Sequence, residues 1–269
     1  MNRITTAVIP VAGSGSRIRP LSLAMPKEML ATPFGPIIEL ITNELIDAGI
    51  EKIIYVTTPG KGLIQQHLNA VTLHKHPDDK KVSLEFINQS SLPGSGGAIL
   101  TVVTEKSLTD PFVVVWGDEI FIEQGSVGRT GELIEAYSKI NKPCILLTEI
   151  NEQDIHKCGM AITRKSESGE NLHRIINLVE KPEHWPHDKK YASVGGYILD
   201  LKTIEFLRQV ELSDDGELYL SKALSNYLQS GEDLYGVLTT CEWHETGSMD
   251  GYISAFESLA ALRRQGILK

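Results

Sequence analysis

Near the N-terminus, two short apolar segments flank an amphipathic helix pattern, and this arrangement constrains the fold more than any other feature. Residues Thr6–Pro10 form a continuous apolar run, which is typical of a strand buried on both faces of a parallel sheet. Residues Ile37–Ala48 repeat apolar positions at helical spacing and end at Gly49, and Lys52–Thr57 is a second β-branched segment. Strand, helix and strand in this order predict a βαβ unit.

The same alternation continues along the chain. It predicts an α/β fold with a doubly wound, mostly parallel (Rossmann-like) sheet. Further strands are expected at Val82–Ile87, Phe112–Trp116 and Cys144–Leu147, with helices at Gly97–Val103 and Gly131–Ile140.

After about Gly159, short strand patterns separated by polar and proline-containing turns predict a smaller α+β lobe. Its expected strands and helices are Met160–Arg164, Ile175–Val179, Val194–Leu199, Leu201–Gln209, Leu218–Leu228 and Gly251–Arg264. The last helix is expected to carry Ile253, Phe256, Leu259 and Ala260 on one apolar side. No linker composition interrupts the chain, so we expect a single domain over 1–269, with halves of about 1–150 and 151–269.

Composition excludes several classes of protein. With 269 residues, 41% of them hydrophobic, the chain can bury a sizeable core. The formal net charge of −9 would repel DNA or RNA, so no nucleic-acid partner is expected. No apolar run approaches the roughly 20 residues of a membrane span, and no signal-peptide core is present, so a cytoplasmic protein without a membrane partner is expected. Three widely spaced cysteines form no CxxC motif, which argues against a disulfide framework or a zinc site.

The turn after the first strand reads Ala12-Gly13-Ser14-Gly15-Ser16-Arg17. Two glycines let the backbone approach a phosphate or a base, and an arginine follows them into the same space. A Rossmann dinucleotide loop is the rival interpretation, but Ile18 stands where its third glycine belongs. A glycine turn alone is equally consistent with a purely structural role.

Lys27 stands ten residues after Arg17, inside the string Pro26-Lys27-Glu28-Met29-Leu30. Together with the glycine turn, this string resembles the bacterial UTP–glucose-1-phosphate uridylyltransferases of the sugar-phosphate nucleotidyltransferase superfamily. The resemblance implies that Arg17 and Lys27 bind the triphosphate. The expected nucleotide-binding residues are Ala12, Gly13, Gly15 and Glu28.

The match covers nearly the whole chain. Gln89 and Gly94 resemble the family segment in which a glutamine side chain and a glycine backbone pair with the uracil edge. Asp118 follows the buried strand Phe112–Trp116, and a carboxylate at the carboxyl end of a central parallel strand lies where such sheets bind ligands. We therefore expect Asp118 to be a ligand of Mg²⁺.

Four later residues resemble the sugar side of the family's site. Gly159 would let the backbone approach the hexose, Glu180 would bind sugar hydroxyls, and Lys181 would bind the sugar phosphate. Val194 lies in a segment resembling the strand that closes over the hexose. Relatives often carry Arg where this chain has Gly196, which implies a reshaped contact. The resemblance thus assigns sugar binding to the smaller lobe.

Glu245, in Trp243-His244-Glu245-Thr246-Gly247, stands where relatives usually have Asp. Glutamate can also bind Mg²⁺, but it is one methylene longer, and Mg²⁺ tolerates little distortion of its octahedron. We expect Glu245 to be the second metal ligand.

The activity that the resemblance implies is nucleotidyl transfer from an NTP, with UTP preferred, to a hexose 1-phosphate, with glucose 1-phosphate preferred. The products are a nucleotide-sugar and pyrophosphate, with Arg17, Lys27, Asp118 and Lys181 as the catalytic set. A non-catalytic, nucleotide-sugar-binding regulatory paralogue is one alternative, suggested by Glu245 and Gly196. The same chemistry with dTTP, CTP or another sugar phosphate is the other, because thymine presents the same hydrogen-bonding edge as uracil.

A homo-oligomer is also implied by the resemblance. Relatives carry a helical insertion after the second strand, whereas this chain has a short polar segment from His67 to Lys81. An interface built on that insertion would be absent here.

Overall fold

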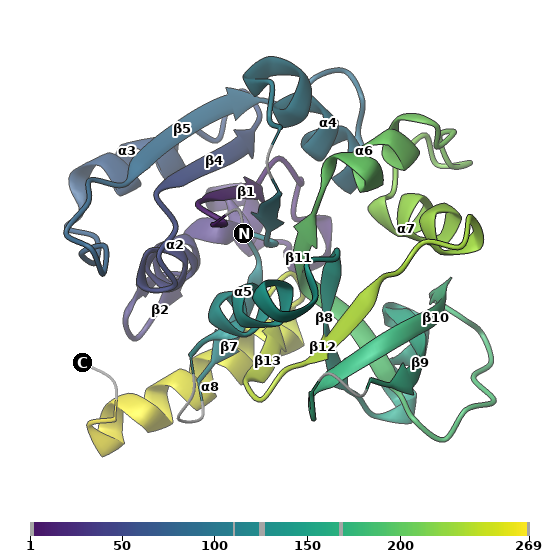
Figure 1. Cartoon of the computed structure of the whole chain (residues 1–269). Coiled ribbons are helices and arrows are strands. Elements are labelled where there is room, and N and C mark those ends of the chain that lie inside the picture. Colours follow the sequence, from purple (N-terminus) through teal and green to yellow (C-terminus); the bar gives the residue numbers. More distant parts are fainter. Residues whose placement is uncertain (1–2, 110, 124–126, 167–168, 268–269) are drawn as a thin grey trace. The chain divides into compact units, whose positions relative to one another are not determined.

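The computed structural model describes residues 3–109, 111–123, 127–166 and 169–267 (Figure 1). Two compact units share the chain. Unit 1 comprises Met1–Ile4, Ser90–Val114 and Arg129–Thr240, and unit 2 comprises Thr5–Gln89, Val115–Gly128 and Cys241–Lys269. Each unit is thus built from separate stretches of sequence, whereas the sequence pattern suggested halves that meet near residue 150.

The predicted βαβ unit opens unit 2. Strands β1 (Thr6–Pro10), β4 (Lys52–Thr57) and β5 (Ser83–Asn88) run parallel and side by side (Figure 1). Helix α2 (Ile37–Asp47) connects β1 to β4 and buries its apolar side. The Thr42 hydroxyl of α2 lies 2.7 Å from the Tyr55 hydroxyl of β4, which joins helix and strand. Helix α3 (Gly62–Ala70) connects β4 to β5. Here the predicted parallel arrangement is confirmed.

The rest of unit 2 consists of short elements and one long helix. Strands β7 (Glu119–Ile122) and β13 (Glu242–Glu245) form an antiparallel pair, and so do β2 (Ala31–Thr32) and β3 (Gly35–Pro36). Short helical turns are η1 (Ser16–Ile18), α1 (Leu21–Ala24) and η2 (Lys27–Met29). Helix α8 (Met249–Gln265) follows β13, and the Ser248 hydroxyl caps it by accepting from the Gly251 N–H at 3.3 Å.

The sheet of unit 1 differs from the prediction. Its strands follow the order β6 (Phe112–Val114), β11 (Tyr191–Leu199), β8 (Cys144–Glu149), β12 (Tyr235–Leu238), β10 (Leu172–Glu180) and β9 (Gly159–Lys165). Among the pairs in these strands, β8–β12 is parallel and the others are antiparallel. The prediction of a mostly parallel sheet was wrong for β6 and β8, because both pair antiparallel with β11, although β8 is parallel to β12. Strand β9 is antiparallel to β10 and β11, and these three strands lie in the stretch where a smaller α+β lobe was expected. A mixed α/β fold is what the chain adopts.

Helices α4 (Gly94–Lys106), α5 (Arg129–Ile140), α6 (Leu201–Arg208) and α7 (Leu220–Gln229) complete unit 1, with the 3₁₀ turn η3 (Glu152–Lys157). Asp200 and Thr203 form a capping box that begins α6, since the Asp200 side chain accepts from the Thr203 N–H at 2.8 Å. All of these helices except η3 were expected from the sequence, to within a few residues.

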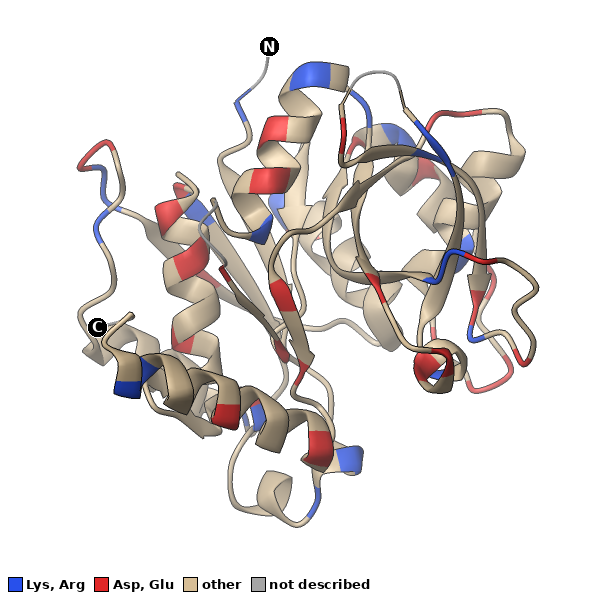
Figure 2. Ribbon diagram, turned by 90° about the horizontal axis from the view of Figure 1, so that it is seen from below, with Lys and Arg blue, Asp and Glu red and all other residues tan. Residues whose placement is uncertain are grey.

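Helix α8 buries only part of the apolar side that was predicted. Ala255 and Leu259 are buried, whereas Ile253 and Phe256 are exposed. The apolar periodicity of this helix is thus only partly matched by its packing. Acidic and basic residues are interspersed along the ribbon, and Arg263 and Arg264 lie in the last turn of α8, where they complement the helix dipole (Figure 2).

Within the described residues, no helix is long and apolar enough to cross a bilayer. Cys144 and Cys241 are buried, and Cys158 is half-buried.

Candidate active site

The glycine turn and Lys27 lie together in unit 2. Gly15 has a φ of +67° and begins η1, and its carbonyl accepts from the Ser22 hydroxyl at 2.6 Å. A side chain on Gly15 would meet Ser22 Cβ at 2.9 Å, so this position needs glycine for both conformation and space. A β-carbon added at Gly13 would lie 3.6 Å from Lys27 Nζ. The exposed turn after β1 and the Lys27 ammonium therefore face the same space.

Lys27 is paired with Asp118. Their side chains form an ion pair and are 15% and 18% exposed. Burial is the largest influence on the pKa of Lys27 and lowers it, but the attraction and hydrogen bond of Asp118, together with the attraction of Glu28, make the net shift upward. Lys27 is thus held as a cation.

Asp118 lies in the turn before β7, after a shorter β6 than predicted. The Val115 N–H donates to the Val8 carbonyl of β1 at 3.1 Å. A side chain on Gly117 would meet Val11 Cγ1 at 2.6 Å, so this glycine allows the turn to approach the carboxyl end of β1. That approach places the turn that carries Asp118 next to the carboxyl end of β1.

Glu245 ends β13 and is paired with Arg17. The Arg17 guanidinium donates to Glu245 Oε1 at 2.8 Å, with the arginine 66% and the glutamate 26% exposed. In the β7–β13 pair, Glu245 stands opposite Glu119. The buried Thr246 donates through its N–H and its hydroxyl to the Asp118 carbonyl, at 2.8 and 2.7 Å. Thr246 therefore fixes the Asp118 turn to the strand that carries Glu245.

The two carboxylates converge on Gly247. A β-carbon added there would lie 2.5 Å from Glu245 Oε1, 2.7 Å from Asp118 Oδ2 and 3.1 Å from an Arg17 nitrogen. Two carboxylate oxygens close to one point suit a hard cation such as Mg²⁺, which binds one or two carboxylates and completes its octahedron with phosphates and water. Among the described residues, no larger group of His, Cys, Asp and Glu is placed to hold a metal.

Glu28 is turned away from this point. It is 1% exposed, and both of its oxygens accept from Lys61 Nζ at 2.9 Å. Burial raises the pKa of Glu28, and Lys61 opposes that shift without cancelling it. Sequence reasoning missed Lys61, which immediately precedes α3.

The predicted base-reading residues fall in different units. Gln89 follows β5 in unit 2, where its N–H donates to the Thr57 carbonyl at 2.8 Å. Gly94 begins α4 in unit 1 with a φ of +87°, and a side chain there would meet the Leu218 carbonyl at 2.6 Å. The close approach to Leu218 gives Gly94 a structural reason to be glycine.

The predicted sugar-binding residues gather in unit 1. Gly159 of β9 stands opposite Glu180 of β10 and opposite Ser193 of β11. A β-carbon on Gly159 would lie 3.2 Å from Glu180 Oε2 and 3.9 Å from Ser193 Cβ. The Lys181 N–H donates to the Cys158 carbonyl at 3.1 Å. The predicted sugar-binding residues Gly159, Glu180 and Lys181 are therefore close together, at neighbouring ends of β9 and β10.

Val194 is buried, and the register of β11 shifts between Val194 and Tyr197. Gly195 and Gly196 lie in that irregularity. The buried Arg129 donates to the Gly195 carbonyl at 2.9 Å. A β-carbon on Gly196 would meet Leu133 Cδ1 at 3.0 Å and Leu146 Cβ at 3.1 Å, so a longer side chain is not accommodated without repacking.

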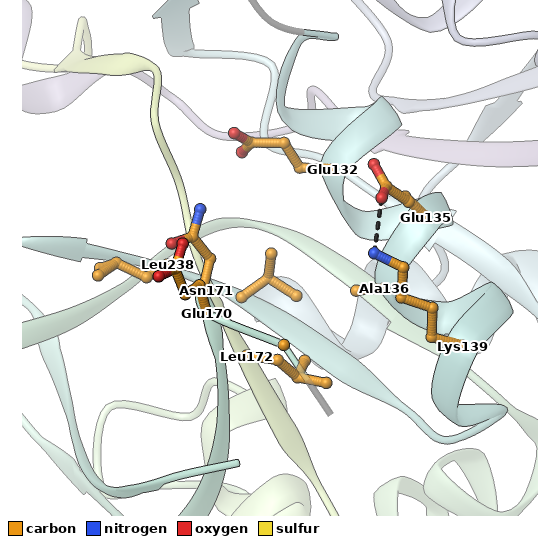
Figure 3. Close-up of a pocket in the computed structure, with 10 residues that line it drawn as sticks. Glu132, Glu135, Ala136, Lys139, Glu170, Asn171, Leu172 and Leu238 are labelled. Carbon is orange, nitrogen blue, oxygen red and sulfur yellow. Dashed lines mark hydrogen bonds and ion pairs between the residues drawn. The ribbon is translucent and has the colours of Figure 1, made fainter. Parts of the chain in front are cut away.

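A pocket of about 200 Å³ in unit 1 lies apart from these residues, between α5, β12 and the start of β10. Two of its acidic groups have partners: Glu135 pairs with Lys139 on α5 (Figure 3), and Glu132 accepts from Thr239 and Thr240. None of the residues predicted from the sequence lines it.

Comparison with known proteins identifies the family. The sequence profile of the nucleotidyl transferases matches residues 6–261. The chain belongs to the nucleotidyl transferase family. It is 30% identical to UTP–glucose-1-phosphate uridylyltransferase 1 of Staphylococcus saprophyticus, over 93% of this chain and 91% of that protein. It is 29% identical to the enzyme of that name in Mycoplasma pneumoniae, over 100% of this chain and 96% of that protein.

The fold agrees with this assignment. A crystal structure of UDP-glucose pyrophosphorylase complexed with UDP-glucose has a TM-score of 0.84 and 23% identity, covering 97% of this chain and 99% of the other. The nucleotidyl transferase resemblance inferred from Pro26–Leu30 is confirmed.

Proposed function

We propose that this nucleotidyl transferase moves a uridylyl group from UTP to glucose 1-phosphate, giving UDP-glucose and pyrophosphate. The names of its relatives support this reaction. The observation that carries the proposal is the convergence of Asp118, Glu245 and Arg17 on Gly247, beside Lys27. Cations and carboxylates together are what transfer between two phosphate anions requires.

On the nucleotide side, Lys27 and Arg17 exchange their carboxylate partners for oxygens of the triphosphate. Each is held by an ion pair, and Arg17 is largely exposed, so its pair with Glu245 is easily exchanged. The backbone from Ala12 through Gly13 to Gly15 lies under the nucleotide. Gln89 and Gly94 read the edge of the uracil.

Asp118 and Glu245 hold a divalent cation, which we take to be Mg²⁺. When bound, it supplies Lewis-acid stabilisation of charge on the phosphate oxygens. Thr246 keeps the backbone of Asp118 next to β13, so the distance between the two carboxylates is set by the fold. As the triphosphate arrives, both carboxylates lose their pairing with Lys27 and Arg17, and the divalent cation would take the place of these two positive charges.

On the sugar side, Glu180 accepts from hydroxyls of the hexose, and Lys181 binds its phosphate. Gly159 leaves room for the hexose between Glu180 and Ser193. The backbone at Val194 completes this subsite. We assign nucleotide binding mainly to residues 1–150 and sugar binding mainly to 151–269.

In the reaction, a phosphate oxygen of glucose 1-phosphate attacks the α-phosphorus of UTP. The bond between the α-phosphorus and the oxygen that bridges to the β-phosphorus breaks, and pyrophosphate leaves. A phosphate monoester is already ionised near neutral pH, so no general base is needed. Lys27, Arg17 and Lys181 hold the reacting anions in place, which accounts for most of the catalysis expected of such a site.

A pyrophosphate-release assay tests the proposal. Four NTPs are screened against several hexose 1-phosphates, with Mg²⁺ and with chelator. We expect UTP with glucose 1-phosphate to react fastest, with activity lost in chelator. Lys27→Met should remove activity, whereas Lys52→Met, which breaks a half-buried Lys–Glu pair at the amino end of β4, should keep it. Background rates for every pair, alongside measurable binding of UDP-glucose, would instead identify a regulatory protein.

The oligomeric state stays a prediction. Light scattering of the purified protein would measure it directly.

A further inference from the structure

A buried ion pair stands directly beside Lys27. Glu28, the next residue, is 1% exposed, and Lys61 is 11% exposed at its side chain. Lys61 Nζ lies 2.9 Å from both Glu28 oxygens, which is a bidentate contact. Ion pairs this well buried are costly to desolvate and are kept only where the geometry is good. The pair joins η2 to the residue that precedes α3.

The two consecutive side chains of η2 thus form ion pairs with different partners. Lys27 pairs with Asp118, and Glu28 pairs with Lys61. The turn has no side-chain cap, and its backbone bonds are Met29 N–H to the Pro26 carbonyl and Leu30 N–H to the Lys27 carbonyl. Two ion pairs therefore decide which way each of the two side chains points.

Electrostatics couples the two pairs. Glu28 attracts the Lys27 ammonium, and Lys61 repels it while being attracted by Asp118. Burial lowers the pKa of Lys61, and the Glu28 carboxylate opposes that shift. With Lys61 present, the Lys61 ammonium neutralises the Glu28 carboxylate. Without Lys61, a buried carboxylate would be left with Lys27 as its nearest counter-charge.

We propose that Lys61 is a positioning residue, which neutralises Glu28 so that Lys27 remains directed at Asp118 and the triphosphate. Lys61 acts through Glu28 and Lys27, and neither Lys61 nor Glu28 touches the nucleotide. This inference rests on the proposed function and adds to it a residue outside the phosphate-binding set. It also changes the expected role of Glu28 from a nucleotide contact to part of the support of Lys27.

The test compares Lys61→Met, Glu28→Gln and the double variant that carries both changes. Lys61→Met should lower kcat/KM for UTP by about a hundredfold, because Lys27 is drawn from its place. The KM for glucose 1-phosphate should stay within about threefold. The double variant removes both charges at nearly constant volume, so it should recover to within about tenfold of the wild type.

Lys80→Met is the matched control, since it breaks an exposed lysine–glutamate pair with Glu51 in the same unit. It should leave kcat/KM for UTP unchanged. Thermal melting of every variant separates lost folding from lost positioning. If Lys61→Met itself does not fold, the charge-neutral double variant still decides the question.

Two results would overturn the inference. One is Lys61→Met with wild-type kcat/KM. The other is a folded double variant that is as inactive as the single ones, which would mean that Lys61 or Glu28 contacts the substrate. A wild-type protein that releases no pyrophosphate from any substrate pair would instead overturn the proposed function, and calorimetric binding of UTP to the same variants would then still measure the positioning of Lys27.

Discussion

Replacing Gly247 by alanine would put a methyl group where the site's charged atoms meet. The added carbon would lie 2.5 Å from Glu245 Oε1 and 2.7 Å from Asp118 Oδ2, against 3.4 Å or more in an ordinary contact. Each carboxylate must therefore retreat by a large part of an ångström. Such a displacement moves the two proposed metal ligands apart.

The effect on folding should be small, because the crowded atoms are the ends of flexible side chains. Alanine also restricts the unfolded chain, which offsets about 0.4–1 kcal/mol of any strain. We expect Tm to change by less than about 3 °C. The effect on catalysis should be large, since a misplacement of about 1 Å can cost about a hundredfold in rate, or about 2.7 kcal/mol of barrier.

Pyrophosphate release at saturating substrates, with thermal melting alongside, measures both effects. Gly62→Ala is the matched control, because a β-carbon there meets nothing within 4 Å and the residue begins a helix of the same unit. It should keep full activity. A Gly247→Ala protein with wild-type kcat would refute the assignment of this point as the place where the cation sits.

Three further predictions concern single side chains. Asp118→Asn should abolish Mg²⁺-dependent turnover. It should also tighten UTP binding in chelator about tenfold by calorimetry, because Lys27 is released and about 1.4 kcal/mol of repulsion between the Asp118 carboxylate and the triphosphate is removed. Weaker UTP binding would contradict the exchange of Asp118 for the triphosphate as the partner of Lys27. Glu245→Asp should keep or raise kcat by freeing Arg17, and a loss above roughly a hundredfold would show that the site needs the longer side chain. The pKa of His173 is lowered first by burial and then by the nearby charges of Lys165 and Lys189. As pH falls, this histidine is therefore protonated in the unfolded chain before it is protonated in the folded one, so the free energy of unfolding should decrease below about pH 6.5. His173→Gln should lose less unfolding free energy between pH 7.5 and 5 in urea titrations than the wild type, and an equal loss would rule this histidine out.

The sequence supported the proposed site residues through local patterns and a family resemblance, and their roles stay predictions. The glycine turn, Lys27 and Asp118 sit next to recognisable strands, and the periodicity of Thr6–Thr57 defines a parallel βαβ unit that the structure confirms. The ion pairs of Lys27 with Asp118 and of Arg17 with Glu245 bring together residues proposed separately.

What the sequence did not reveal depends on contacts between distant segments. Lys61 is an ordinary lysine after a glycine until folding buries it against Glu28. Thr246 gains its role only when its hydroxyl reaches the Asp118 carbonyl. Strand direction in unit 1 was missed for the same reason, since alternating apolar patterns reveal that strands exist but not which neighbours they pair with.

The interleaving of the two units has a consequence for the order in which the protein is made. Unit 2 needs Cys241–Lys269 to be complete, and this stretch is translated after every residue of unit 1. Domains generally begin to fold as they leave the ribosome. Unit 1 can therefore fold on the nascent chain, while Arg17 still lacks Glu245 and the Asp118 turn still lacks the hydrogen bonds of Thr246. Until that stretch emerges, the growing polypeptide cannot form the proposed nucleotide site, and a ribosome stalled before it would hold a protein whose unit 2 is incomplete.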